Sequence, residues 1–142
     1  MLLTLLAIPV ALAATPLVVE VTPDSLTMTA PEGTMPLLQG QALPGMGRFE
    51  LTIDIDTDGL PEFEVRPGFL QNVRATAWYS KSHTGLNRMP TLEVMRLWPN
   101  PADTTLPPMA TLTRVAFGRL HVVVDTDQDG EPDGEAMAPF GW

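Results

Sequence analysis

The sequence predicts an all-β fold, either a β-sandwich or a barrel-like sheet. Its 142 residues include 15 prolines and 11 glycines that separate short apolar runs, and this spacing favours turns and strands over long helices. Several of the runs alternate apolar with polar residues, which is the pattern of a strand with one buried face. Five or more short strands between Gly and Pro clusters are typical of a sandwich or a barrel-like sheet.

Residues 1–13 are expected to form a signal peptide. They are uncharged and apolar, contain Pro9, and end in Ala11-Leu12-Ala13, which fits a small-residue cleavage site. The run is too short for a membrane-spanning helix, which needs about 20 apolar residues. A buried N-terminal strand or helix is the alternative, because no Lys or Arg precedes the run. Residues 14–142 are then expected to form a single β-rich domain, which is long enough to bury a core.

Strands are expected in six places along this domain. They cover residues 17–22, 49–54, 62–65, 73–79, 92–98 and 120–125. The segment 92–98 also fits a helix, because Leu92, Met95 and Trp98 would share one helical face. A bulge is expected near Gly118, where the parity of the apolar positions changes. Irregular chain is expected over two proline-rich stretches, residues 30–45 and 99–108.

Two segments of the domain are similar in sequence. Residues 47–64, GRFELTIDIDTDGLPEFE, align without a gap with residues 118–135, GRLHVVVDTDQDGEPDGE. The identical pairs are Gly47 and Gly118, Arg48 and Arg119, Asp54 and Asp125, Asp56 and Asp127, Asp58 and Asp129, Gly59 and Gly130, Pro61 and Pro132, and Glu64 and Glu135. We interpret the two segments as an internal repeat of one strand-loop-strand unit. Chance similarity between two independent loops is the alternative.

The acidic residues are concentrated in these two units. The formal charge is -9, and residues 54–64 and 125–135 hold 11 of the 17 carboxylates and no basic residue. This net charge opposes nonspecific binding to nucleic acid or to an anionic membrane surface. The chain has no cysteine, which excludes disulfides, thiolate metal sites and a cysteine nucleophile.

The acids of each loop follow the pattern D-x-D-x-D-G-x-P-[DE]. Carboxylates at every second position converge when a loop coils, and a glycine permits the sharp turn. Without a cation, two carboxylates about 5 Å apart repel by about 3 kcal/mol at an effective dielectric constant of about 20. A hard divalent ion removes this repulsion. Calcium, which takes roughly 6–8 oxygen ligands, suits the loops better than magnesium or softer metals.

The sequence therefore predicts two calcium sites. The expected ligands of the first site are the carboxylates of Asp54, Asp56, Asp58 and Glu62 with the backbone carbonyl of Leu60. Those of the second site are the carboxylates of Asp125, Asp127, Asp129 and Asp133 with the backbone carbonyl of Glu131.

Each loop resembles the calcium loops of the integrin-type propeller repeats and of the thrombospondin type 3 repeats, which share D-x-D-x-D-G-x-x-D. The resemblance covers about eleven residues in each copy, and it implies ligand roles but no global fold. An EF-hand is similar through its sixth position but places a bidentate Glu at its twelfth, which is Val65 or Ala136 here. That difference argues against a helix-loop-helix calcium sensor.

Two other interpretations of the loops are weaker. A solvated hairpin tip does not require the regular spacing of Asp, Gly and Pro. The second interpretation is phosphotransfer, because each loop resembles the haloacid dehalogenase nucleophile motif in having D-x-D after an apolar strand. However, it has Thr or Val two positions after the second Asp, where this chain has Asp58 and Asp129, and it requires an α/β scaffold.

These observations predict an exported, calcium-stabilised domain that is not an enzyme. It would be secreted, periplasmic or at the cell surface, serve as a cell-surface, adhesion or assembly module, and bind calcium and another surface protein or a glycan, with oligomers possible. One alternative is a carbohydrate-binding or hydrolase accessory domain that uses segment 77–88, where Trp78 and Tyr79 stand beside polar residues. Another alternative is a subunit of an extracellular filament.

Overall fold

A computed structural model of the protein describes residues 16–43, 48–67, 75–79, 88–90, 94–99 and 104–141. The regular structure of these residues is almost entirely β. In chain order its elements are β1 (Val18–Thr22), β2 (Ser25–Thr29), β3 (Leu38–Leu43), β4 (Arg48–Ile53), β5 (Phe63–Pro67), β6 (Ala75–Tyr79), β7 (Arg88–Pro90), β8 (Val94–Leu97), β9 (Ala110–Val115), the short 3-10 turn η3 (Ala116–Gly118), β10 (Arg119–Val124) and β11 (Gly134–Ala138).

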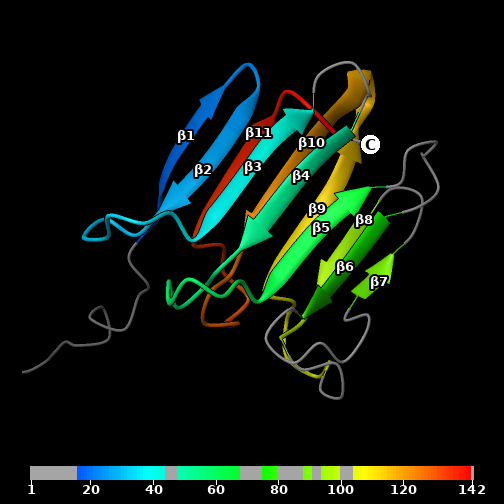
Figure 1. Ribbon diagram of the computed structural model, residues 1–142. Coiled ribbons are helices and arrows are strands. Elements are labelled where there is room, and N and C mark those ends of the chain that lie inside the picture. The colour runs from blue at the N-terminus through cyan, green and yellow to red at the C-terminus, as the bar shows by residue number, and fades with distance from the viewer. Residues whose placement is uncertain are drawn as a thin grey trace, which may run out of the picture.

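The strands form two antiparallel sheets that lie face to face (Figure 1). One sheet has the order β1-β2-β3-β4-β5-β6 and the other has the order β11-β10-β9-β8-β7. Within each sheet, strands that are neighbours in sequence are also neighbours in space. No ladder joins the two sheets in the described part of the chain, so the all-β prediction is confirmed as a sandwich, and the barrel-like alternative is not.

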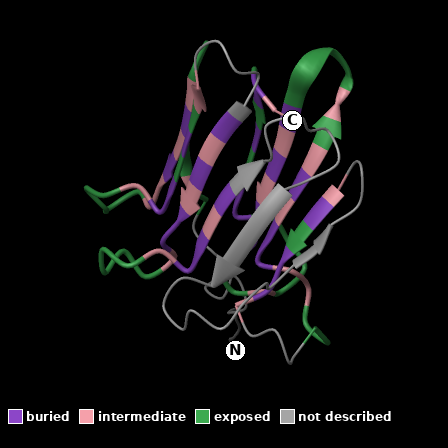
Figure 2. Ribbon diagram, turned by 45° about the vertical axis from the view of Figure 1, so that its right-hand side comes forward, coloured by how far each residue is buried: buried purple, intermediate pink, exposed green. Residues whose placement is uncertain are grey.

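The core lies between the two sheets and takes residues from both. On β4, Phe49, Leu51 and Ile53 are buried, and on β10, Leu120, Val122 and Val124 are buried. All six belong to one apolar cluster. The intervening positions face outward, and Figure 2 shows the resulting alternation of buried and partly exposed positions along the strands. Burial of this apolar surface is the main stabilising term of such a fold.

The two sheets share not only strand order but also register. The β4–β5 pairs Leu51↔Val65 and Ile53↔Phe63 match the β10–β11 pairs Val122↔Ala136 and Val124↔Gly134. The pairing of β2 with β3 and of β3 with β4 likewise matches that of β8 with β9 and of β9 with β10. Each paired position of β2 to β5 therefore has a defined counterpart in β8 to β11.

The strand predictions are largely confirmed. β1, β4, β5, β6, β8 and β10 lie where strands were expected, with bounds shifted by a few residues. The helix alternative for 92–98 is wrong, because residues 94–97 are a strand. β3 falls inside the stretch 30–45 that was expected to be irregular. That expectation failed because Gly40 occupies a core-facing position of β3 without an apolar side chain.

The predicted bulge near Gly118 is also wrong. β9 and β10 are joined there by the tight turn η3, in which Phe117 has φ 66° and Gly118 has φ 69°. The core-facing positions are even-numbered in both strands, with Ala110 and Leu112 buried on β9 and Leu120, Val122 and Val124 buried on β10. The apparent change of parity came from Phe117, which is exposed. Residues 1–13, the expected signal peptide, lie outside the described residues. In the described part of the chain, no helix has the length and apolar character needed to cross a membrane.

Candidate metal centre

Two acidic loops occupy equivalent places in the two sheets. Loop 1, residues 54–62, connects β4 to β5, and loop 2, residues 125–133, connects β10 to β11. Both loops emerge at the lower end of the sandwich in Figure 1. The strand ladders that precede the loops are matched in register, so the loops begin from equivalent backbone positions.

The first and last acids of each loop are buried at the end of the core. The exposed fractions are 8% for Asp54, 5% for Glu62, 6% for Asp125 and 7% for Asp133. The backbone N–H of Glu62 donates to the carbonyl of Ile53, and that of Asp133 donates to the carbonyl of Val124, both at 2.8 Å. The ladders thus extend one step past the strands and hold two carboxylates side by side at the base of each loop.

Inside each loop the chain coils around the first aspartate. The N–H of Gly59 donates to Asp54 Oδ2 at 2.8 Å, and the N–H of Gly130 donates to Asp125 Oδ2 at 2.8 Å. Both glycines are left-handed, with φ 90° and 93°, a conformation that L side chains rarely adopt. The predicted sharp turn at the glycine is therefore present in both loops.

A second left-handed residue in each loop was not predicted. Thr57 has φ 51° and Gln128 has φ 56°. Each N–H points back to the carbonyl of the first aspartate, at 3.2 Å for Thr57 to Asp54 and 3.3 Å for Gln128 to Asp125. A threonine and a glutamine give no sequence signal for this conformation, which is uncommon for residues other than Gly, Asn and Asp.

The coiling brings the acids together. In loop 1 the carboxylates of Asp54, Asp56, Asp58 and Glu62 each offer an oxygen within 4.8 Å of the others. In loop 2 the same holds for Asp125, Asp127 and Asp133. Both clusters are composed of oxygen donors around one centre, so each can hold a metal ion.

One predicted carboxylate ligand, Asp129, is placed differently. Asp129 is outside the loop 2 group, and its Oδ1 accepts the N–H of Glu131 at 2.8 Å. Leu60 donates its N–H to Asp58 Oδ1 at 2.9 Å in the same way, although Asp58 stays within its group. The predicted roles of the Leu60 and Glu131 carbonyls remain predictions.

One oxygen of loop 1 has no partner. Asp54 Oδ1 is the buried side-chain atom that lacks a hydrogen bond among the described residues. Its counterpart, Asp125 Oδ1, accepts the N–H of Asp129 at 3.2 Å. A buried polar atom without a partner costs about 1–3 kcal/mol, and a cation at the centre of the cluster would remove that cost.

Burial and crowding change the ionisation of the same acids. Burial raises the pKa of Asp125 to about 6, and Asp127 and Asp129 add to the rise, while the hydrogen bond from Gly130 opposes it. Burial also raises the pKa of Asp54, together with Asp56, Glu62 and Asp58. The hydrogen bond from the N–H of Glu131 lowers the pKa of Asp129. At Asp54 and Asp125, the first aspartates of the two loops, burial and neighbouring carboxylates thus both favour the protonated form.

Loop 2 carries contacts that loop 1 lacks. Asp133 Oδ2 accepts both the N–H and the hydroxyl of Thr126, at 2.6 and 2.5 Å, whereas Ile55, at the corresponding place, offers only its N–H to Glu62 Oε1 at 2.5 Å. The side-chain amide of Gln128 donates to the carbonyl of Pro107 at 2.9 Å. Sequence analysis did not predict these contacts. The hydroxyl of Thr126 was a signal for the first contact, and the sequence held no signal for the contact of Gln128 with Pro107.

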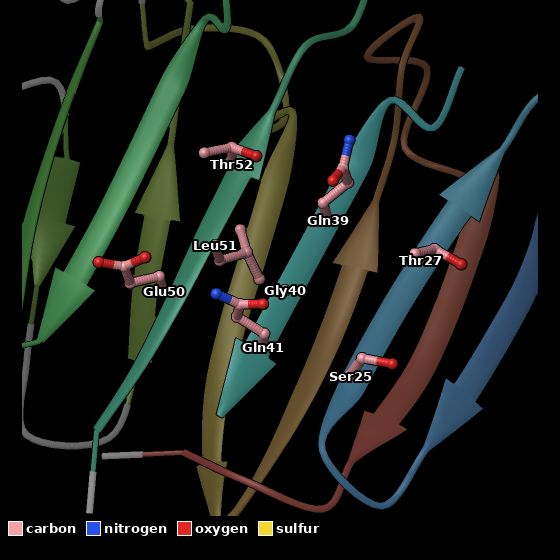
Figure 3. A pocket seen from close by; sticks show the side chains of 8 residues that line it. All are labelled: Ser25, Thr27, Gln39, Gly40, Gln41, Glu50, Leu51 and Thr52. Atoms are coloured by element: carbon pink, nitrogen blue, oxygen red, sulfur yellow. The ribbon is translucent and has the colours of Figure 1, made fainter. Parts of the chain in front are cut away.

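A separate hollow lies on the outer face of the first sheet (Figure 3). It has a volume of about 310 Å³ and is lined by Ser25, Thr27, Gln39, Gly40, Gln41, Glu50, Leu51 and Thr52. Sequence analysis did not predict it. Of the aromatic segment 77–88 that was predicted as an alternative site, residues 77–79 belong to β6 and residue 88 to β7, and residues 80–87 lie outside the described residues.

Comparisons of the chain with protein-family models, with curated proteins and with solved structures give no match. The resemblance of the loops to integrin-type and thrombospondin type 3 calcium loops remains a prediction. The geometry of the two acidic clusters is therefore the main basis for a functional inference.

Proposed function

We propose that this protein is an exported β-domain whose two loops bind calcium and which serves as a cell-surface, adhesion or assembly module. The observation that carries the proposal is the convergence of carboxylates in both loops, two of them buried in each loop, with the unpartnered Asp54 Oδ1 in one of them. Acidic residues whose role was solubility alone would have no reason to be buried or to converge.

The donor set favours calcium over other metals. Both clusters consist of carboxylate oxygens, which are the ligands that hard cations prefer. The two clusters contain no nitrogen or sulfur ligand of the kind that zinc or copper favours. Calcium–oxygen distances are about 2.3–2.6 Å, so ligands on opposite sides of one ion lie about 4.6–5.2 Å apart. The ligand oxygens of each cluster all lie within 4.8 Å of one another, so a single ion can reach them. Magnesium requires a tighter octahedron and keeps more of its water.

In this proposal the ions are structural. Each would neutralise a loop and tie the end of one strand to the start of the next, so that binding free energy adds to the free energy of unfolding. Sites of extracellular modules typically have dissociation constants of about 10⁻⁴–10⁻³ M. Such sites are filled at the calcium concentrations found outside cells, which is why we propose a non-catalytic, constitutively loaded domain.

Isothermal titration of the metal-free protein with calcium tests the binding. We expect two ions per chain, one ion for Asp56→Ala or Asp127→Ala, and none for the double variant, because each substitution removes a ligand from one cluster. Titration with magnesium at the same concentrations is the control for ion selectivity. Absence of saturable calcium binding to the unmodified chain would refute the proposal.

The module role needs a separate test. Fractionation of the expressing cells, with mass spectrometry of the N-terminus, should place the protein outside the cytoplasm and show cleavage after about residue 13. Sedimentation velocity at increasing concentration distinguishes a monomeric module from the filament alternative, which predicts polymers. An intact N-terminus in the cytoplasm would contradict export without affecting the proposed calcium sites.

A further inference from the structure

We infer that the hollow on the outer face of β2, β3 and β4 is a binding site for a neutral carbohydrate. Its volume of about 310 Å³ lies at the lower end of the roughly 300–1,000 Å³ range of small-molecule sites. The inference is independent of the calcium sites, because the hollow belongs to the strands and not to the loops.

Six polar side chains form a regular grid over the hollow. One row consists of the cross-strand neighbours Ser25, Gln41 and Glu50, and the next row consists of Thr27, Gln39 and Thr52. Leu26, Leu38 and Leu51 alternate with them and are buried in the core, so the six face outward. Figure 3 shows these side chains spread across the three strands. Neighbours within a row have Cβ atoms about 4.5–5.5 Å apart, so their polar groups can contact one small ligand together.

Gly40 lies at the centre of the grid. A Cβ on this residue would be 3.4 Å from Leu51 Cδ1 and 3.5 Å from Phe140 Cζ. The backbone of β3 therefore rests directly on the core at this point, and the hollow opens on the other side of the same strand. A glycine inside a strand marks a place where backbone approaches another group closely.

The second sheet provides an internal comparison. Its ladder pairs Thr113↔His121 and Thr111↔Val123 are the counterparts of Gln41↔Glu50 and Gln39↔Thr52. The residues that correspond to Ser25 and Thr27 are Val94 and Arg96, and Leu112 stands in the place of Gly40. The same frame thus carries different chemistry on its outer face, which means that the fold does not require this polar grid.

The lining chemistry selects the class of ligand. Amides and hydroxyls each donate and accept hydrogen bonds, and Glu50 adds an acceptor. The absence of Lys and Arg from the lining disfavours an anionic ligand, and a single carboxylate is too few for a metal site. A wall of polar groups would leave an apolar ligand with unpaired neighbours. The hydroxyls of a sugar both donate and accept, which matches this lining.

The experiment is an NMR titration of the ¹⁵N-labelled, calcium-loaded protein with cellotriose, maltotriose and triacetylchitotriose. We expect at least one of them to shift the side-chain amide signals of Gln39 and Gln41, with saturation and a Kd on the order of 1 mM, as for a shallow polar site. The double variant Gln39→Ala/Gln41→Ala should bind about tenfold more weakly, because two neutral hydrogen bonds are lost.

Two further variants make the result specific. Thr52→Val removes a hydroxyl at nearly constant shape, and valine is the residue at the corresponding position 123 of the second sheet. This variant should weaken binding severalfold without changing the fold. Thr111→Ala/Thr113→Ala, the matched change in the second sheet, should leave binding unchanged. Three results would each overturn the inference: none of the trisaccharides shifts the two amides, the shifts fall in segment 77–88 instead, or the glutamine double variant binds like the unmodified protein.

Discussion

At the scale of single residues, Asp54 and Asp125, the first aspartates of the two loops, differ in the hydrogen bonding of one oxygen. Asp54 and Asp125 both accept a glycine N–H at Oδ2, but Asp125 Oδ1 also accepts the N–H of Asp129, whereas Asp54 Oδ1 is buried without a partner. The cluster around Asp54 also contains one more carboxylate. We therefore expect loop 1 to depend more strongly on a cation than loop 2.

This difference predicts unequal gains in stability for two matched amide variants. In calcium-free buffer, Asp54→Asn should raise the free energy of unfolding by about 1 kcal/mol, because the amide removes a charge and can donate to the neighbouring acids. Asp125→Asn should gain less, because its Oδ1 already serves an N–H donor that an NH₂ group cannot satisfy. Urea denaturation of both variants measures the difference. A loss of stability in Asp54→Asn without calcium would contradict the assignment.

The raised pKa of Asp125 predicts how stability depends on pH. Its ordinary value is 3.8 and its value in the fold is about 6, so between these values the folded state holds a proton that the unfolded state has lost. The stability of the calcium-free protein should therefore fall as the pH rises from about 4 to above 6. The lowered pKa of Asp129 acts below 3.8, outside this window.

Calcium should reverse that trend, because the ion replaces the proton and binds the carboxylate form. Melting temperatures at about pH 4.5, 5.5 and 7, measured with and without calcium, give the two slopes. We expect the calcium-free curve to descend and the calcium-induced gain in melting temperature to grow with pH. A calcium-free melting temperature that rises across this range would be incompatible with the burial of Asp125 as an uncompensated acid.

At the scale of elements, the β9–β10 hairpin contains a strained turn. Phe117 is left-handed, with φ 66°, and its side chain is 93% exposed. Tight hairpins with two left-handed residues favour Asn-Gly, and the chain already supplies Gly118. Phe117→Asn should raise the free energy of unfolding by about 0.5–1 kcal/mol, since it relieves strain and removes no buried surface.

The control for this turn is Phe117→Ala, which removes the ring but keeps an L residue with an ordinary Cβ at the left-handed position. It should change the free energy of unfolding little. Chemical denaturation of the two variants separates the effect of backbone strain from that of the aromatic ring. Equal stabilities for the Asn and Ala variants would indicate that the turn is not strained.

The same elements show why the sequence predicts some features and not others. The strands β4 and β10 are predictable because apolar residues occupy every second position, Phe49, Leu51 and Ile53 on β4 and Leu120, Val122 and Val124 on β10. β3 is not, because Gly40 sits on the core face where an apolar residue would give the signal. The convergence of four acids in loop 1 follows from their spacing, whereas in loop 2 the same spacing brings only three acids together. The tether from Gln128 to Pro107 does not, because it joins residues whose proximity depends on the packing of two loops.

At the scale of the whole molecule, the five strands β1–β5 of the first sheet correspond in order and register to the five strands β7–β11 of the second sheet. The correspondence includes the anchoring bonds of the loops: the N–H of Asp54 donates to the carbonyl of Leu37 at 2.6 Å, and the N–H of Asp125 donates to that of Met109 at 2.8 Å. This agreement supports the proposal that segments 47–64 and 118–135 are copies of one unit. It also explains why both acidic loops lie at one end of the sandwich (Figure 1).

The most direct test of the account is thermal melting of the protein in excess calcium, in excess magnesium and in chelator, repeated for the double variant Asp56→Ala/Asp127→Ala. Each removed carboxylate belongs to one of the two clusters and is exposed, so the substitutions should remove ligands without damaging the core. The account predicts a calcium-selective rise in melting temperature that the double variant loses. A melting temperature of the unmodified protein that is the same in all three solutions would contradict it.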